Sequence, residues 1–339
     1  ELGAALSAPL GDVAVLCAGG DLESLDDVLF LDTETTGLAG GAGTFVFLVG
    51  LAGFRNGLFE VRQWLLPDPA DEEALLDALE EEARTARGIV SFHGRGFDVP
   101  RIEERFLLAG RSPPFLDVPH LDLLVGARRV FRMRAGRVNL QHLERLVLGT
   151  SRLDDLPGAE CPQAWYDYVK GDPGPMWRVL EHNLLDLLSL PTLLAALAEP
   201  AAGAGPAPDV HAAGKVLARA GMTDRALQLQ RGAASRAVDA NVAARAHDEA
   251  ARILRRQRRP SEAAVEALAA TMADPSLPGP WLALAKHHEH ATKDLELALA
   301  CCRRLERVLF LHSRSASRKR DLQARIARLE RKLLARAGD

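Results

Sequence analysis

The chain is poor in the features that mark secreted, disulfide-bonded and membrane-spanning proteins. Its 339 residues include four cysteines, and their positions show no metal-ligand spacing. Cys301 and Cys302 are adjacent, which makes them a poor disulfide pair, and this usage favours a reducing compartment. No apolar run approaches the ~18–20 residues that a membrane span needs, and no signal peptide is visible. We therefore expect a cytoplasmic protein without membrane association.

A phosphate-binding loop is also missing. Residues 37–44 (GLAGGAGT) are rich in glycine, but no Gly-Lys-Ser/Thr follows them and no GxGxxG is completed. The segment is typical of a tight connection between two strands.

Charge is distributed unevenly over the chain. Residues 1–200 carry 31 acidic and 17 basic residues, a net charge of −14, whereas residues 201–339 carry 15 acidic and 25 basic residues, a net charge of +10. An acidic first part with a basic second part suggests a metal site in one and a polyanion contact in the other.

The pattern of apolar residues predicts an α/β fold with a mixed sheet for the first part. Three strands come first, and Asn56-Gly57 between the second and third is a strong hairpin signal. Strands and helices then alternate, which favours parallel pairing. The expected strands are 28–31, 45–53, 57–66, 89–92 and 120–121. The expected helices are 69–86, 97–109, 122–131, 140–148, a short one near 165–169, and a long one over 176–197.

A Pro/Gly/Ala segment divides the chain. We predict an irregular lead-in over 1–24, the α/β domain over 25–199, a linker over 200–209 (PAAGAGPAPD) and an all-helical domain over 210–339. In the helical domain Ala226 and Ala263 each follow a turn, about 37 residues apart, and Ala298 falls one residue late in a third helix pair. This period is near the 34 of tetratricopeptide repeats, whose small residues let paired helices pack closely. An ordinary helical bundle is the alternative.

Two carboxylates stand at the end of the first predicted strand. Asp32 and Glu34 are two residues apart, so they point to the same face of the strand. Two such acids repel each other and are costly to bury unless a cation lies between them. Because hard divalent cations prefer several carboxylate oxygens, the pair indicates a metal site. A solvated strand end is the alternative.

Two further acids stand where a metal site would need them. Asp98 lies at the start of a predicted helix, where it is also a common helix N-terminal residue. Asp186 lies on an otherwise apolar helix, and a carboxylate among leucines needs a partner. His182 is one turn upstream on the same helix face, so a local His–Asp pair is the alternative there.

The ordered set Asp32, Glu34, Asp98 and Asp186 resembles the DEDD 3′→5′ exonuclease family of the ribonuclease H-like superfamily. Five segments are similar to the YprB-type exonucleases of bacteria: 31–38 (LDTETTGL), 46–51 (VFLVGL), 120–124 (HLDLL), 152–158 (RLDDLPG) and 182–190 (HNLLDLLSL). The resemblance covers about residues 25–197. It implies a ribonuclease H-like (DnaQ-like exonuclease) mixed sheet flanked by helices, followed by tetratricopeptide-like repeats.

Phosphodiester cleavage by two divalent ions about 4 Å apart needs several carboxylates and a nearby base. We expect Asp32 to bridge the ions, Glu34 and Asp98 to hold one ion each, and Asp186 to complete the first site. Mg²⁺ or Mn²⁺ suits such oxygen ligands. His182, with an ordinary pKa of about 6.5, is the candidate base.

The position of His182 departs from the family pattern. In histidine-type DEDD enzymes the His usually stands five residues before the last Asp, but here that position is Glu181. His182 occupies the position four residues before Asp186, where the tyrosine type places its Tyr. The two tyrosines of the chain, Tyr166 and Tyr168, lie well upstream.

Contacts to substrate are expected from arginines, whose forked side chains match phosphate oxygens. The first candidate run comprises Arg128, Arg129, Arg132, Arg134 and Arg137, with a solvated helix face as the alternative. The second is the basic C-terminal run over 314–332, which could instead contact a partner or only solvent. His120 and Asp122 are interpreted as structural, a polar strand end and a helix cap.

The resemblance implies a metal-dependent 3′→5′ exonuclease that acts on DNA in DNA repair. A 3′→5′ exoribonuclease of the same mechanism is the first alternative, because no residue in the sequence specifies contact with a 2′-hydroxyl. The second alternative is a scaffold whose repeats bind a protein partner such as a helicase while the nuclease site is vestigial.

Overall fold

A computed structural model describes residues 2–37, 43–312 and 316–337. The chain divides into two compact units, Glu1–Ala202 and Gly203–Asp339. The predicted glycine-rich connection over 37–44 lies largely outside the described residues.

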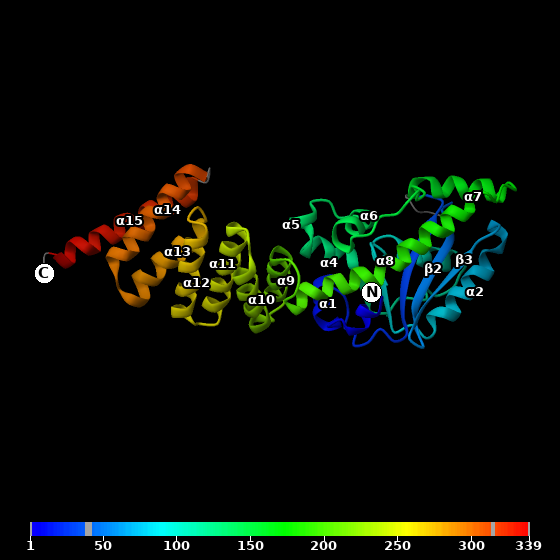
Figure 1. Ribbon diagram of the computed structural model, residues 1–339, viewed down its shortest axis with the longest axis horizontal. Coiled ribbons are helices and arrows are strands. Elements are labelled where there is room, and N and C mark those ends of the chain that lie inside the picture. Colours follow the sequence, from blue (N-terminus) through cyan, green and yellow to red (C-terminus); the bar gives the residue numbers. More distant parts are fainter. Residues whose placement is uncertain (1, 38–42, 313–315, 338–339) are drawn as a thin grey trace. The chain divides into compact units, whose positions relative to one another are not determined.

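The first unit is built on a five-stranded mixed sheet with the order β3-β2-β1-β4-β5 (Figure 1). β1 pairs antiparallel with β2, β2 pairs antiparallel with β3, and β1, β4 and β5 run parallel. Asn56 and Gly57 connect β2 to β3 with positive φ angles of 52° and 79°, as the predicted hairpin requires. The strands are β1 Val28–Thr35, β2 Val46–Arg55, β3 Leu58–Leu65, β4 Gly88–Ser91 and β5 His120–Asp122. The sequence-based prediction of a mixed sheet is confirmed.

Helices surround this sheet, and their bounds fall within a few residues of the predicted ones. They are α2 Glu72–Ala83, α3 Asp98–Leu108, α4 Leu123–Val130, α5 Arg132–Ala135, α6 Leu140–Leu143, α7 Cys161–Val169 and α8 Met176–Ala202. Short 3₁₀ turns cover Leu2–Ser7, Pro69–Asp71 and Gly158–Glu160, and a π-helical turn, Glu144–Leu148, continues α6. The core lies between strands and helices, where the rings of Phe47 on β2 and Trp165 on α7 stack with centroids 5.4 Å apart.

Helix α8 packs against β1 and β2 (Figure 1). Gly50 on β2 lies opposite Asp32 in the β1–β2 pairing. A Cβ atom at Gly50 would lie 2.3 Å from Oδ1 of Asn183 and 2.6 Å from Cδ1 of Leu187, both on α8. Glycine therefore permits the close approach of α8 to the strand pair beside Asp32.

The predicted irregular lead-in over 1–24 is wrong in part. Residues Leu10–Cys17 form α1, which packs against α4 and α8. Val13, Leu16 and Cys17 are fully buried, because their 3–4-residue spacing places them on one helix face. Eight residues were too few for this period to be distinguished from a loop in the sequence.

The predicted linker over 200–209 is shorter in the structure. Helix α8 continues through Pro200 to Ala202, and the next helix begins at Ala207, so residues 203–206 connect the two. Among the described residues, α8 also has the length and apolar composition of a membrane span, although no apolar run of that length was expected. Half of its most apolar window is buried inside the protein, as in a core helix.

The second unit is all helical, as predicted. Its helices are α9 Ala207–Arg219, α10 Thr223–Arg236, α11 Ala240–Arg256, α12 Pro260–Ala273, α13 Pro278–His287, α14 Leu295–His312 and α15 Ala316–Ala337, with a π-helical turn over His288–Thr292. Successive helices pack on each other, and Ala226, Ala263 and Ala298 are buried at these contacts. The tetratricopeptide assignment stays a prediction.

The basic C-terminal helix neutralises a buried acid of its own unit. Glu289, 2% exposed, accepts hydrogen bonds from Arg325, Arg328 and Lys332 of α15. These cations hold the pKa of Glu289 at about 2 despite its burial, which acts in the opposite direction. At these three positions the basic run has a structural role.

Candidate active site

Strand β1 ends in the two acids that the sequence singles out. Asp32 and Glu34 are half-buried, whereas the intervening Thr33 is buried on the other face. Oδ2 of Asp32 accepts a hydrogen bond of 2.8 Å from Nδ2 of Asn183 on α8. The alternation of the strand thus directs both acids toward α8.

Asp98 reaches the same strand from the first residue of α3. Its Oδ1 accepts hydrogen bonds from the backbone N–H and the hydroxyl of Thr33, at 3.1 and 2.5 Å. The side chain is 5% exposed. Asp98 is therefore fixed against β1 at Thr33, the residue between Asp32 and Glu34, rather than turned to solvent as a simple helix-end acid.

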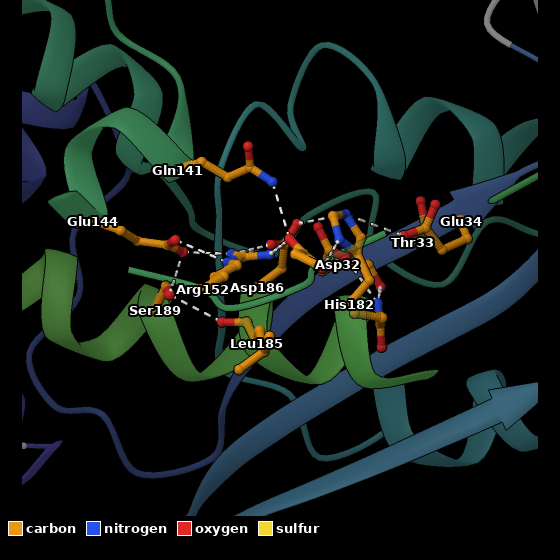
Figure 2. A network of polar contacts seen from close by, with 12 residues as sticks. Asp32, Thr33, Glu34, Gln141, Glu144, Arg152, His182, Leu185, Asp186 and Ser189 are labelled. Carbon is orange, nitrogen blue, oxygen red and sulfur yellow. Dashed lines mark hydrogen bonds and ion pairs between the residues drawn. The ribbon is translucent and has the colours of Figure 1, made fainter. Parts of the chain in front are cut away.

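Asp186 is held on α8 by an arginine from the segment before α7. Arg152 donates to Asp186 and also binds both carboxylate oxygens of Glu144. Figure 2 shows the guanidinium of Arg152 between these two acids, and Ser189 donates to Glu144 from the next turn of α8. Each charge in this row is hydrogen-bonded, which burial of such groups requires.

His182 is oriented by a second acid of the same segment. Its Nδ1 lies 2.8 Å from Oδ1 of Asp155, and Asp155 also accepts from Arg152 at 3.0 Å. Nε2 of His182 faces the acids, 3.9 Å from Oε1 of Glu34 and 3.9 Å from Oδ2 of Asp186. A neutral ring with its proton on Nδ1 thus presents a lone pair on Nε2 to the carboxylate cluster.

Burial and the charges of neighbouring acids raise the pKa of Asp32 and of Glu34. Burial, followed by the charges of Asp186, Asp98 and Glu34, raises the pKa of Asp32 well above its usual value. Burial raises the pKa of Asp98 to about 6, although the hydrogen bond from Thr33 opposes the shift. The cluster therefore concentrates negative charge that the surrounding side chains only partly compensate.

The pKa values of Glu34, Asp186 and His182 are shifted as well. Burial raises the pKa of Glu34 to about 7 and also raises that of Asp186, where Arg152 acts in the opposite direction. Burial lowers the pKa of His182, but Asp186, Asp155 and Glu34 together raise it above its ordinary value. A divalent cation would relieve the repulsion, and carboxylate oxygens are the ligands that Mg²⁺ and Mn²⁺ prefer.

The structure thus brings together the five residues singled out in the sequence. Four further residues that the sequence reasoning missed support them: Arg152, Asp155, Asn183 and Glu144. Arg152, Asp155 and Asn183 lie inside the motif segments 152–158 and 182–190. Their roles depend on contacts between distant segments, so the sequence offered no signal for a particular partner.

The five arginines of the run before α6 have different surroundings in the structure: two bind backbone carbonyls and the other three are exposed. Arg129 donates to the carbonyls of Val15 and Leu16 at the end of α1, and Arg134 donates to the carbonyl of Leu146. Both are structural contacts. Arg128, Arg132 and Arg137 are exposed and stay candidates for phosphate contact.

Asp122 and His120, which the sequence indicated as structural residues, make structural contacts. Asp122 accepts from the backbone N–H groups of Leu124 and His93, which caps α4 and fixes the preceding loop. His120 pairs through Nε2 with Ser91 at 2.7 Å.

A mixed sheet with carboxylates on its central strand and on two flanking helices is the arrangement of a metal-dependent nuclease of the RNase H superfamily. The sequence-family model of the RNase H superfamily matches residues 29–198, and the chain belongs to this superfamily. The chain is also 32% identical over 315 residues to the uncharacterized protein YprB of Bacillus subtilis (strain 168). The match covers 91% of this chain and 75% of that protein.

Proposed function

We propose that the protein is a metal-dependent 3′→5′ exonuclease that hydrolyses the phosphodiester bonds of DNA in a repair setting. The observation that carries the proposal is the convergence of Asp32, Glu34, Asp98 and Asp186. Burial and the charges of the other three acids raise the pKa of Asp32. The 3′→5′ direction, DNA as substrate and the repair setting rest on the motif resemblance. Membership of the RNase H superfamily supports the hydrolytic chemistry.

The donor set fits two divalent ions. Asp32, Glu34, Asp98 and Asp186 would hold them, with Mg²⁺ or Mn²⁺ as the ions that suit these ligands. When bound, the ions would neutralise the charge on the scissile phosphate and lower the pKa of the attacking water.

His182, supported by Asp155 and Arg152, would accept the proton of the attacking water. With Nδ1 held by Asp155, the Nε2 lone pair faces the carboxylates and can accept a proton from the attacking water. Asp155 would stabilise the resulting imidazolium. Arg152 would act as a positioning residue, because it fixes Asp155 and Asp186 relative to each other.

The second unit would bind a protein partner such as a helicase through tetratricopeptide-like repeats. A cytoplasmic location completes the proposal and rests on cysteine usage, since all four thiols are free and buried.

A labelled-substrate panel tests the activity. Single- and double-stranded DNA and RNA, labelled at the 5′ or the 3′ end, are incubated with Mg²⁺, Mn²⁺ or EDTA. We expect a ladder of shortened products from 5′-labelled DNA, immediate release of labelled mononucleotide from 3′-labelled DNA, and no reaction in EDTA. Preference for RNA would instead favour the exoribonuclease, and the reverse labelling pattern would contradict the 3′→5′ direction.

Matched variants test the site. Asp32→Asn and Asp186→Asn should abolish degradation, because each removes a carboxylate from the set. Asp154→Asn and Glu181→Gln are the controls: both residues are exposed, and each is the sequence neighbour of a site residue. Full activity in Asp32→Asn would exclude the site. No degradation by folded wild-type protein with either metal would favour the scaffold alternative.

A further inference from the structure

A cysteine adds a third kind of donor atom at the edge of the carboxylate cluster. Cys161, the first residue of α7, is fully buried, and its thiol hydrogen-bonds to the carboxylate of Glu34. One ligand atom each from Glu34, Cys161 and His182 lie within 4.8 Å of one another. These residues come from β1, α7 and α8, so three separate elements converge on this point.

The spacing and orientation suit a small tetrahedral ion. Zinc takes thiolate sulfur at about 2.3 Å and imidazole nitrogen or carboxylate oxygen at about 2.0–2.2 Å, which separates neighbouring ligand atoms by about 3.6 Å. Ligand atoms at most 4.8 Å apart need to approach one another by about 1.2 Å at most to reach that separation. Asp155 already holds Nδ1 of His182, which leaves Nε2 free for a metal.

The donor chemistry differs from that of the four-carboxylate set. Sulfur and nitrogen select borderline-soft ions such as Zn²⁺, whereas Mg²⁺ and Mn²⁺ favour oxygen alone. Oδ2 of Asp186 lies 3.9 Å from Nε2 of His182, beside this group of three donors. On binding, the Cys161 thiol would lose its proton to solvent, and Glu34 would exchange a thiol donor for the ion.

We propose that Glu34, Cys161 and His182 form an inhibitory site for Zn²⁺ or a similarly thiophilic divalent ion. An ion there withdraws one carboxylate and the candidate base from the reaction. Zinc binding stands on the geometry alone, whereas inhibition rests on the proposed nuclease function.

Cobalt is the spectroscopic probe for this site. Co²⁺ bound to a thiolate gives a charge-transfer absorption band in the near ultraviolet, which oxygen and nitrogen ligands do not give. Titration of the full chain with Co²⁺ should produce this band, and Zn²⁺ should then remove it by displacing the cobalt. Cys161→Ser should lose the band, whereas Cys301→Ser, a change in the second unit, should retain it. A missing band in wild-type protein, or an unchanged band in Cys161→Ser, would overturn the site.

One measurement on the wild-type chain needs neither a variant nor enzyme activity, and a second tests the inhibitory role. X-ray absorption of the zinc-loaded wild-type chain should show one sulfur ligand, and a zinc shell without sulfur would overturn the proposal. In the DNA assay with Mn²⁺, the Zn²⁺ concentration for half-inhibition should rise at least about 10-fold in Cys161→Ser. Equal inhibition of both proteins would remove the inhibitory role, while the cobalt band reports binding even if no nuclease activity is found.

Discussion

Replacing Glu34 by glutamine should stabilise the metal-free protein at neutral and alkaline pH. The pKa of Glu34 is raised from 4.5 to about 7, mainly by burial. A shift of about 2.5 units, at about 1.4 kcal/mol per unit, corresponds to ~3 kcal/mol. Because the raised pKa belongs to the folded state, this cost is absent below pH 4.5 and develops as the pH rises to about 7. Glutamine keeps the shape of the side chain and removes the charge.

Unfolding in EDTA at two pH values measures this effect. At pH 8 the Glu34→Gln variant should unfold with a midpoint about 6–12 °C above that of wild-type protein, as ~3 kcal/mol implies for a unit of this size. At pH 4.5 the two midpoints should nearly coincide. Hydrogen exchange of peptides from β1 assigns the transition to the first unit.

Adding metal should reverse the order of the unfolding midpoints of wild-type protein and Glu34→Gln. Mg²⁺ or Mn²⁺ should raise the midpoint of wild-type protein, because it binds the folded state, and should raise that of Glu34→Gln much less. The exposed Glu181→Gln serves as the control for a change of charge alone. If Glu34→Gln in EDTA at pH 8 were no more stable than wild-type protein, the inferred cost of a buried negative charge at Glu34 would be refuted.

Three further changes test the parts around the acids. Asp155→Asn should lower nuclease activity ~10–100-fold. It should also move the acidic limb of the pH–rate profile to lower pH, because Asp155 raises the pKa of His182. Gly50→Ala should destabilise the first unit by ~1–3 kcal/mol, since the new Cβ would overlap Asn183 and Leu187; urea unfolding measures it. Arg152→Met should cost ~3–5 kcal/mol in the same assay, because Glu144 and Asp186 lose their common partner.

Two of these changes have a control in the chain. Asp154→Asn is the neighbour of Asp155, and its unchanged pH profile is needed to attribute the shift to the contact with His182. Gly11→Ala in α1 meets no atom within 4 Å and should not destabilise the protein. An Asp155→Asn profile identical to that of wild-type protein would exclude an orienting role for Asp155. Unchanged urea unfolding of Arg152→Met would mean that its ion pairs contribute no net stability.

Local sequence patterns were sufficient for most of the fold. Alternating apolar residues and the Asn56-Gly57 turn predicted the hairpin of β2 and β3, and the 3.6-residue period predicted the main helices. The same local rules placed Asp32 and Glu34 on one face of β1, and His182 and Asp186 on one face of α8. These features depend on neighbours within a turn or a strand, which the sequence states directly.

Contacts between distant segments were decided by the tertiary structure. Arg152 and Asp155 complete the site from a segment 27 or more residues before their partners on α8. Arg129 binds the end of α1, about 114 residues upstream. A side chain's charge does not specify which of many possible partners it meets, because that choice follows from the packing of the whole chain. The sequence thus determined which acids the protein presents, and the tertiary structure decided which cations, donors and thiol surround them.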